Sequence, residues 1–505
     1  MKAEIEFGNL KVPQSDWEAT PTSVQHLVIT LLEQMNQLNR RVEELEEQTR
    51  KNSKNSSKPS SKDEPSAKSA QKKVSNRKVI GFKPRQGKQE RELYAPEDCQ
   101  AIHDERPQVC PDCGEVLRGN DAAPLRHQIV EMPIIKPEIE EYRLHELECA
   151  HCGRKTRAPL PPGVSQRCYG PRLAGWIGLL SGAYRQSHRQ VGDLLVEGFG
   201  IKLSRGSINR ARQEVSESLA SVVEATHAYV VQQPVVNCDE TGFAQGNQDG
   251  LNPSKRRGWL WVLVTPLVTF FYVTLSRSQA TAQELLSKDF DGYLGSDRYS
   301  SYAWLDPKQR QVCWAHLLRD FQAMAERSGV SAEIGTALLV RGYRLFHWWH
   351  RVRDGTLSQE LFIAAVAQLR VGFIAELEAA ANLPIGSKEK TPLAKTVRTC
   401  AKILAIESAL WSFVSIDGVE PTNNAAERAL RPAVIWKYTS FGSQSQAGSE
   451  FVARILTVNA TLKAQHRSVL EFLTQACQAA RLGIDAPSLL PSQTHPQLPQ
   501  SLIIL

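Results

Sequence analysis

The chain has 505 residues, of which 41% are hydrophobic and 23% charged, and its formal net charge is +7. This length exceeds what one hydrophobic core supports, so roughly three to five structural units are expected. Ten cysteines, four of them in two C-x-x-C pairs, exclude the disulfide framework of a small secreted protein. No signal sequence opens the chain, and the bacterial cytoplasm is the expected location.

Residues 24–49 carry apolar side chains at heptad spacing, the first recognisable element in the chain. One seam position has Val24, Leu31, Leu38 and Leu45, and the other has Val28, Met35 and Val42. The pattern predicts a coiled coil within residues 1–50 that joins the chain into a homo-oligomer. The alternative is an amphipathic helix that packs on its own protein.

Residues 50–91 carry the basic excess. They hold fourteen Lys or Arg against three acidic residues. Such a segment attracts nucleic acid because binding releases condensed counterions. A linker that its lysines keep soluble explains this feature equally well. The Ser/Lys/Pro composition is too polar to bury a core, so residues 51–95 are expected to form a disordered linker.

Two C-x-x-C-G motifs follow, "CPDCG" and "CAHCG", with thirty-five residues between Cys113 and Cys149. Thiolates suit tetrahedral zinc, and each motif places two sulfur atoms on one side of the ion. We therefore expect a structural Zn²⁺ on Cys110, Cys113, Cys149 and Cys152. The site would lie in a strand-rich zinc ribbon over residues 96–165, with an extra hairpin between the two pairs.

Residues 166–230 have a helical pattern that contains a helix, a glycine-bearing turn and a second helix. Ser204 is placed to cap the second helix, which would expose Arg205, Asn209, Arg210 and Arg212. This arrangement suits a DNA-binding helix-turn-helix. Helix pairs of this kind are equally common without DNA.

Residues 231–320 alternate strands and short helices. "PVVNCDETGF" reads as a strand that ends in Asp239, and the uncharged residues 258–275 read as two buried strands joined at Thr265-Pro266 rather than as a membrane span. A short helix, a strand end with Asp297, and a fifth strand leading into a helix follow. Residues 321–418 are expected to form a helical region.

The stretch "EPTNNAAERAL", residues 420–430, reads as a capped helix start with Glu427 in its first turns. Residues 419–470 would complete the core, and residues 471–505 a C-terminal helix and tail. Three antiparallel strands, a helix and two further strands give the order of a ribonuclease H-like fold, with a helical insertion before the last part. We therefore predict a multidomain α+β protein with a mixed five-stranded sheet.

In that fold one acid lies on the first strand, one after the fourth and one on a later helix. Asp239, Asp297 and Glu427 occupy these three places. Crowded carboxylates repel one another until divalent cations neutralise them. Two magnesium ions could then activate the attacking oxygen and stabilise the leaving one at a phosphodiester. Taken singly, each acid has a simpler explanation as a cap, a turn residue or a surface residue; taken jointly, in this order, these explanations are improbable.

Over nearly its whole length the chain resembles the transposases of the insertion sequence 66 family. The matching motifs are the N-terminal heptads, "NSSKPSS", the C-x-x-C pairs, "YGPRL", "DET", "GSDRYSSY", "CWAH" and "NNAAERALRP". The resemblance implies a DDE transposase whose catalytic, Mg²⁺-binding residues are Asp239, Asp297 and Glu427, with Mn²⁺ as an alternative ion. The double-stranded DNA of the element ends and of the target would be its substrates, and small proteins of the same element would be its helpers.

Five further residues are expected to be accessory to this site: His316, Arg319, Asn424, Arg428 and Arg431. A satisfied core histidine explains His316 equally well. The chain departs from the family pattern at Thr422, where aspartate is usual, and at Leu318, where the first of two arginines is usual. Two other functions compete: a non-catalytic DNA-binding regulator and a ribonuclease H-like structure-selective nuclease.

Overall fold

The computed structural model describes residues 4–7, 10–49, 51–52, 54–56 and 92–491. The predicted linker lies mostly outside the described residues, and so does the predicted C-terminal tail after residue 491. The chain divides into two compact units: Met1–Glu64, Glu141–Asp193 and Lys202–Leu505 form the first, and Pro65–Glu140 with Leu194–Ile201 form the second. Among the described helices, none has the length and apolar composition to cross a membrane.

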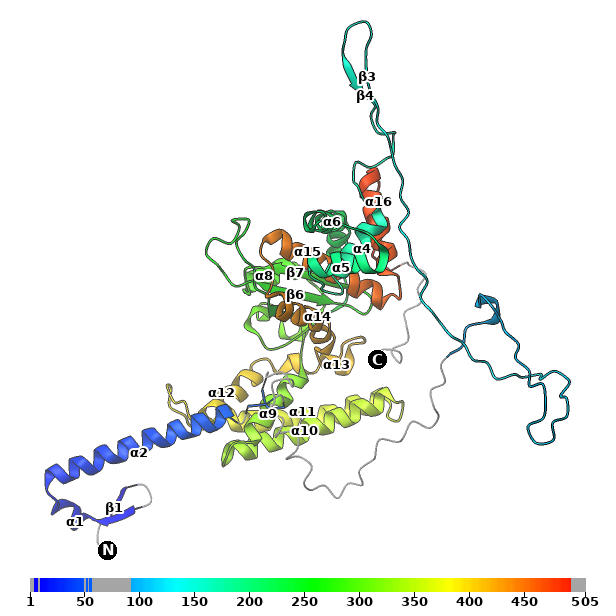
Figure 1. The fold of residues 1–505 in the computed structure, drawn as a ribbon. Coiled ribbons are helices and arrows are strands. Elements are labelled where there is room, and N and C mark those ends of the chain that lie inside the picture. Colours follow the sequence, from blue (N-terminus) through cyan, green and yellow to red (C-terminus); the bar gives the residue numbers. More distant parts are fainter. Residues whose placement is uncertain (1–3, 8–9, 50, 53, 57–91, 492–505) are drawn as a thin grey trace. The chain divides into compact units, whose positions relative to one another are not determined.

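A five-stranded mixed sheet lies at the centre of the first unit (Figure 1). Its strands, in the spatial order β7-β6-β5-β8-β9, are Thr269–Thr274, Trp259–Val264, Val235–Gly242, Tyr293–Ser296 and Arg310–Val312. Strands β5, β6 and β7 are antiparallel neighbours, whereas β8 pairs parallel with β5 and β9 parallel with β8. The predicted α+β class with a mixed five-stranded sheet is confirmed.

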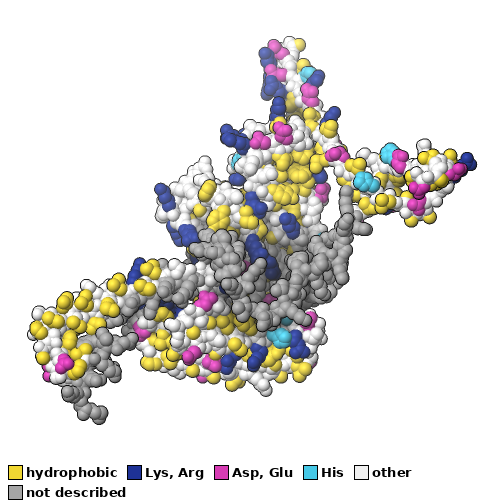
Figure 2. Space-filling model, turned by 60° about the horizontal axis from the view of Figure 1, so that its bottom comes forward, with side chains coloured by type: hydrophobic (Ala, Val, Ile, Leu, Met, Phe, Trp, Pro, Cys, Tyr) yellow, Lys and Arg dark blue, Asp and Glu magenta, His cyan; other side chains and the backbone are white. Residues whose placement is uncertain are grey.

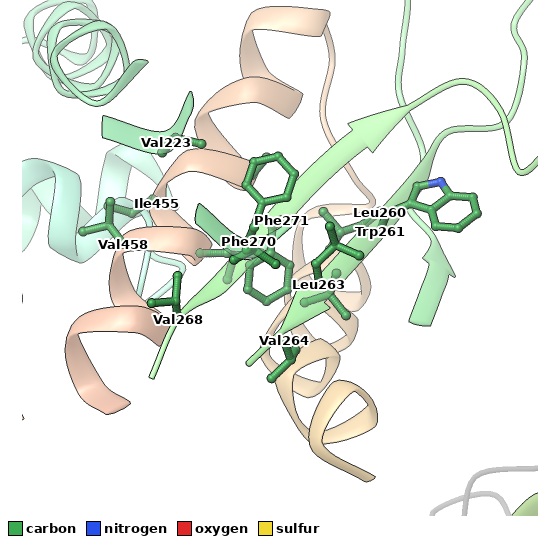
Figure 3. Packing of buried hydrophobic residues seen from close by; sticks show 14 of the residues in the cluster. Val223, Leu260, Trp261, Leu263, Val264, Val268, Phe270, Phe271, Ile455 and Val458 are labelled. Atoms are coloured by element: carbon green, nitrogen blue, oxygen red, sulfur yellow. The ribbon is translucent and has the colours of Figure 1, made fainter. Parts of the chain in front are cut away.

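The uncharged segment at residues 258–275 forms strands β6 and β7, as predicted. Thr265 closes the turn, since its backbone N–H donates to the Val268 carbonyl over 2.9 Å. Side chains of both strands pack with Ile455 and Val458, which come from a helix near the end of the chain (Figure 3). The segment is apolar because it lies in the middle of a protein core.

Both edges of the sheet are covered. At the β7 edge, the N–H groups of Thr269 and Phe271 donate to the hydroxyls of Thr461 and Thr457 over 3.0 and 2.9 Å. At the β9 edge, Gln311 accepts a hydrogen bond from the Phe413 N–H over 3.0 Å. These contacts cover β7 and β9, the two edge strands of the five-stranded sheet.

Helices pack around this sheet and continue its core. Upstream are α4 (Pro171–Ser181), α5 (His188–Phe199), α6 (Arg205–Ser218) and α7 (Ala220–Val230). Between the strands are α8 (Gln279–Leu286) and the short η4 (Ser300–Tyr302) and η5 (Pro307–Gln309). Downstream are α14 (Asn424–Ser440), α15 (Gln446–Ala464) and α16 (Val469–Leu482). Helix α14 packs over β5 and β6, and α15 packs against β7.

The region between β9 and α14 is helical, as predicted, and has a hydrophobic core of its own. Its helices are α9 (Trp314–Ala325), α10 (Val330–Arg353), α11 (Gln359–Ala381), α12 (Pro392–Leu404), η6 (Glu407–Leu410) and α13 (Ser412–Ser415). Trp314 is the centre of this core: its ring lies 5.2 Å from that of Trp411 and 5.5 Å from that of Phe373, and its indole N–H donates to the Leu410 carbonyl. The core also includes Val312 of β9, so it continues directly from the sheet.

The N-terminal part contains two short strands, one short helix and one long helix. They are β1 (Glu4–Phe7), β2 (Leu10–Pro13), α1 (Gln14–Glu18) and α2 (Thr22–Thr49). Helix α2 covers all the predicted heptads, and hydrophobic side chains are visible along its surface (Figure 2). Leu31, Leu38 and Leu45 on one seam are all exposed.

The predicted strand-rich character of residues 96–165 is wrong for the stretch between the two cysteine pairs. The described elements in this region are η3 (Pro96–Asp98), an isolated bridge between Val109 and Val116, and strands β3 (Glu146–Glu148) and β4 (Lys155–Arg157). Residues 117–145, all of them described, contain no strand. Pro133 and Pro137 interrupt the apolar pattern there, and proline cannot donate to a strand ladder.

Candidate active site

Asp239 lies on β5, the middle strand of the sheet. Side chains of a strand alternate between its faces, so Asp239 and Thr241 share one face while Cys238 and Glu240 are buried on the other. Helix α14 covers the face of Asp239, because Lys437 of α14 donates to the Thr241 hydroxyl over 2.9 Å. The strand was predicted to end at Asp239, and this is wrong. It continues to Gly242 through pairing with β6.

Asp297 follows directly after β8 and is brought beside Asp239 by the parallel pairing. The register sets Asn237 opposite Gly295, and two residues further along each strand are the two aspartates. The Asp297 carboxylate accepts the Tyr299 N–H over 2.8 Å, which fixes the turn. Residues almost sixty positions apart in sequence therefore meet at one place in the sheet.

Glu427 lies in the first turn of α14, as predicted. The expected side-chain cap is absent, however, because Asn423 at the N-cap position donates from Nδ2 to the Cys238 carbonyl over 2.8 Å. Its backbone N–H also donates to the Cys313 Sγ over 3.2 Å. Asn423 therefore ties the start of α14 to β5 instead of capping the helix.

The three acids share one electrostatic environment. Burial first, and then the neighbouring carboxylates of Glu240, Asp297 and Glu427, raise the pKa of Asp239 to about 8. Crowded carboxylates disfavour one another's charge. In addition, Glu427 Oε1 is buried and accepts no hydrogen bond among the described residues. Both features fit a group of oxygens that binds a divalent cation.

Two of the predicted accessory residues contact Glu427. Its Oε1 lies 3.7 Å from His316 Nδ1 and 3.8 Å from Arg319 Nη2. Burial, and then the Arg319 charge, lower the pKa of His316. Possible ligand atoms of Cys313, His316 and Glu427 all lie within 4.8 Å of one another. The possible metal ligands therefore include a nitrogen atom and a sulfur atom beside the carboxylates.

The other predicted site residues lie on exposed helix faces. Asn424, Arg428 and Arg431 are exposed on α14, outside the group of acids. On α6, Arg205 and Arg210 are exposed and Asn209 is half-buried. Ser204 caps α6 as predicted, since it accepts the Ser207 N–H over 3.1 Å.

Arg212 is a correction to the expected exposed face of α6. Its guanidinium lies 4.7 Å from the centre of the Phe451 ring, and burial lowers its pKa. The i+3 and i+4 pattern of a helix cannot tell which basic side chain a later helix will cover.

A buried polar network beneath Asp239 was missed by sequence reasoning. Glu240 accepts from Arg277 over 2.7 Å and from the Tyr302 hydroxyl, and the Tyr302 hydroxyl also lies 3.4 Å from Cys238 Sγ. Arg277 in turn lies 3.6 Å from the centre of the Tyr299 ring. A signal existed: strand alternation places the residue after Asp239 inside the core, where a carboxylate needs a partner.

The two cysteine pairs form turns of the same geometry. In each, the first cysteine N–H donates to the carbonyl five residues on, at 2.8 Å for Cys110 and 2.9 Å for Cys149, and the glycine after the second cysteine donates back to the first. Both glycines, Gly114 and Gly153, have φ near +70°. We call these turns the cysteine knuckles.

The chemistry of the knuckles favours metal ligation. Backbone N–H groups of Cys113 and Asp112 lower the pKa of Cys110, and those of Cys152 and His151 lower the pKa of Cys149. The thiolate is the form that binds a metal. Cys110 and Cys113 belong to the second unit, and Cys149 and Cys152 belong to the first.

The sheet, the clustered acids and the helical region between Asp297 and Glu427 form the arrangement expected of a protein of the transposase class. Residues 183–451, more than half of the chain, match the model of the transposase IS66 family, and the chain belongs to this family. The matched range contains all three clustered acids.

Two other matches cover less of the chain. Residues 11–92 match a family of unknown function (DUF6444). A curated relative, "Uncharacterized protein y4qI" of Sinorhizobium fredii (strain NBRC 101917 / NGR234), is 27% identical over 245 residues, which are 43% of this chain and 43% of that protein. The chain thus spans less than half the length of this relative.

Proposed function

We propose that the protein is a DDE transposase that binds the ends of its insertion sequence and catalyses metal-dependent DNA cleavage and strand transfer. The observation that carries the proposal is the convergence of Asp239, Asp297 and Glu427, three acids from distant parts of the sequence, at one place in the sheet. Their mutual repulsion, which contributes to the raised pKa of Asp239, is what a divalent cation would relieve.

The sheet supports a ribonuclease H-like catalytic core. Its strand order places an antiparallel meander beside two parallel strands, and the helical region enters between β9 and α14. This insertion separates Asp297 from Glu427 in sequence, while the Asn423 hydrogen bond to β5 brings Glu427 back to the sheet. The same fold could serve a nuclease, but family membership favours a transposase.

Asp239, Asp297 and Glu427 would hold Mg²⁺, or Mn²⁺ in its place. When bound, two such ions activate an attacking oxygen and stabilise the leaving oxygen at a phosphodiester. The residues of the chain orient the ligands: His316 and Arg319 flank Glu427, and the Tyr299 N–H fixes Asp297. Arg277 and Tyr302 hold Glu240 under the strand, which keeps Asp239 in place.

Double-stranded DNA would be bound by parts of the chain outside the sheet. Arg205, Asn209 and Arg210 are available on α6, the second helix of the helix-turn-helix. The cysteine knuckles would bind one structural Zn²⁺ through Cys110, Cys113, Cys149 and Cys152. Small proteins of the same element would assist.

Helix α2 would join chains into an oligomer, because its exposed heptad leucines need a partner. Changing Leu31 and Leu38 together to Glu should shift the sedimentation profile of the full chain to smaller species. Ile29, which is exposed but lies off both seams, provides the matched control Ile29→Glu. If Ile29→Glu dissociates the protein equally, or the double variant changes nothing, α2 is not the oligomerisation helix.

The catalytic assignment is tested with Glu427→Gln, which keeps the size of the side chain and removes its charge. Magnesium-dependent nicking and joining of a plasmid with the element ends should fall by about three orders of magnitude or more. Binding of those ends in a gel-shift assay should persist.

The matched control is Glu420→Gln on the approach to the same helix. Glu420 is half exposed and lies 3.8 Å from Arg353, so its loss should be mild. Normal strand transfer by both variants would refute the DDE assignment. Loss of transfer with Glu420→Gln alone would show that the wrong glutamate was chosen.

A further inference from the structure

The exposed side of α14 changes in character along its length. Arg428 and Arg431 come first, and Ile435, Tyr438 and Phe441 follow at spacings of three and four residues. At 100° per residue, the side chains of Arg428, Arg431, Ile435 and Tyr438 lie within an arc of about 80° on α14. Phe441 follows directly after the helix ends at Ser440. We call these five side chains the α14 stripe. Its basic end lies one turn from Glu427.

The two arginines of the α14 stripe are free to bind an anion. Both are exposed, and neither has an ion-pair or hydrogen-bond partner among the described residues. Paired guanidinium groups one turn apart match the phosphates of a nucleic-acid strand.

The aromatic end of the α14 stripe is exposed to solvent. Phe441 is 83% exposed and Tyr438 is 61% exposed. Phe441 also has a φ of +59°, in the left-handed region that a residue with a side chain rarely adopts. A phenylalanine at this position gains neither burial nor a favourable backbone, so its presence indicates a function in binding.

The turn that carries Phe441 is anchored to the strand of Asp239. Directly after β5, the Ala244 carbonyl accepts the Ser443 N–H over 2.9 Å, and the Ser443 carbonyl accepts the Gly246 N–H over 2.8 Å. Lys437 lies 5.6 Å from the Tyr438 ring centre and donates to the Gly242 carbonyl on β5. The aromatic end of the α14 stripe and Asp239 are therefore both held in place by β5 and the residues that follow it.

We propose that the α14 stripe binds an unpaired DNA strand beside the active site: Arg428 and Arg431 hold its phosphates, and Tyr438 and Phe441 stack on its bases. Aromatic rings together with cationic side chains are the recurrent means of binding single strands without sequence preference. The proposal rests on the proposed function, because it assigns the DNA next to the site of cleavage.

The length of α14 sets the position of the stacked bases. Tyr438 lies eleven residues after Glu427, which is ~16 Å along a helix axis. At ~3.4 Å per stacked nucleotide, this distance corresponds to about five nucleotides. Bases about five nucleotides from the cleaved phosphate are therefore the ones that the stripe would hold unpaired.

Binding of fluorescent twenty-nucleotide oligothymidylate and of a random-sequence duplex of equal length tests the proposal in EDTA, where no cleavage occurs. Phe441→Gly is the sharpest variant, because glycine favours the left-handed backbone and keeps the fold. Phe441→Gly and Tyr438→Ala should each weaken binding of oligothymidylate ~5- to 150-fold. Their binding of the duplex should change less than about twofold.

The matched control is Tyr343→Ala on α10, where the tyrosine is 58% exposed but far along the chain from the stripe. It should bind both DNAs as the unaltered protein does. Arg428→Ala with Arg431→Ala should weaken both and reduce the salt dependence of binding.

Three outcomes would overturn the proposal. In the first, oligothymidylate binds Phe441→Gly and Tyr438→Ala normally; in the second, Tyr343→Ala loses as much affinity as they do. In the third, the stripe variants dissociate an oligomer without a change in DNA binding, which makes the stripe a protein interface. Because Glu427→Gln is measured by cleavage and the stripe by binding in EDTA, failure of one leaves the other standing.

Discussion

The clustered acids and the cysteine knuckles are built in opposite ways. Asp239, Asp297 and Glu427 are held by a covered sheet and by hydrogen bonds between residues far apart in sequence, such as that from Asn423 to Cys238. The knuckles are local turns in which every hydrogen bond spans a few residues, and Cys113, Cys149 and Cys152 are exposed.

This difference teaches which site depends on its metal for structure. The sheet brings the acids together at a cost in repulsion, and a cation would relieve a strain already present. The knuckles have little core around them, so a bound ion would itself be the main source of tertiary structure. Loss of metal should therefore abolish the activity of the clustered acids and unfold the cysteine knuckles.

The largest effect is expected from Cys149→Ser. Structural zinc contributes about 10–16 kcal/mol of apparent binding free energy in zinc-finger peptides, so loss of a ligand should remove the zinc and loosen residues 96–165. Elemental analysis should give about one zinc per unaltered chain and near none per variant. Limited proteolysis of the full chain should then cut within residues 96–165 and spare the sheet.

Cys168→Ser is the control, because Cys168 is exposed and free but lies outside both knuckles. It should retain zinc and the original cleavage pattern. A zinc-free protein that still resists proteolysis in this region would erase the contrast between the two sites.

Next comes Asn423→Ala, which removes a buried amide that joins α14 to β5. The variant should lose about 1–3 kcal/mol of unfolding free energy, because the Cys238 carbonyl is left without this partner. Strand transfer should fall together with stability, since Glu427 follows the start of α14. Asn424→Ala, one residue on and exposed, is the control for denaturant unfolding; equal loss in both would show that Asn423 is no anchor.

Secondary-structure elements could be predicted from the sequence more readily than the contacts of individual side chains. The β6–β7 hairpin, the Ser204 cap and the helix start before Glu427 follow from local patterns, and the structure contains all three. The partner of Asn423 and the place of Arg212 do not, because each depends on an element far away in sequence.

The candidate site shows the same limit. The order of the three acids along the chain was enough to predict that they converge, because strand order fixes which residues become neighbours in a sheet. Glu240, Arg277 and Tyr302 were missed because their contacts cross the core. Zinc binding and the coiled coil stay predictions.

A smaller effect, of opposite sign, is expected from Asp239→Asn in EDTA. An ordinary aspartate has a pKa near 3.9 in the unfolded chain, against about 8 here. The folded state therefore binds this proton more tightly, and its stabilising contribution is complete below pH ~4 and is lost as the pH rises to about 8.

The Asp239→Asn variant does not undergo this loss. Its free energy of unfolding at pH 8 should therefore be about 1–2 kcal/mol higher than that of the unaltered protein, with little difference near pH 4. Denaturant unfolding across this pH range measures it. Added Mg²⁺ should stabilise only the unaltered protein. A variant that is less stable at pH 8 would show that the acids are not under electrostatic strain.

The smallest effect is expected from Gly114→Ala in a knuckle. Its φ of +73° disfavours a side chain, but a Cβ there would meet no atom within 4 Å, so the cost should be about 1 kcal/mol of backbone strain. Gly153→Ala should cost the same, and competition with a zinc-sensitive dye should show a loss of affinity of up to about tenfold for either. Gly442→Ala is the counterpart beside the end of β5. Its Cβ would collide with the Ala244 backbone, so that variant should lose more stability than either knuckle variant. Unequal losses at the two knuckles would mean that one of them is held by contacts beyond its own turn, and the contrast between a local site and a core-built one would then apply to only one of them.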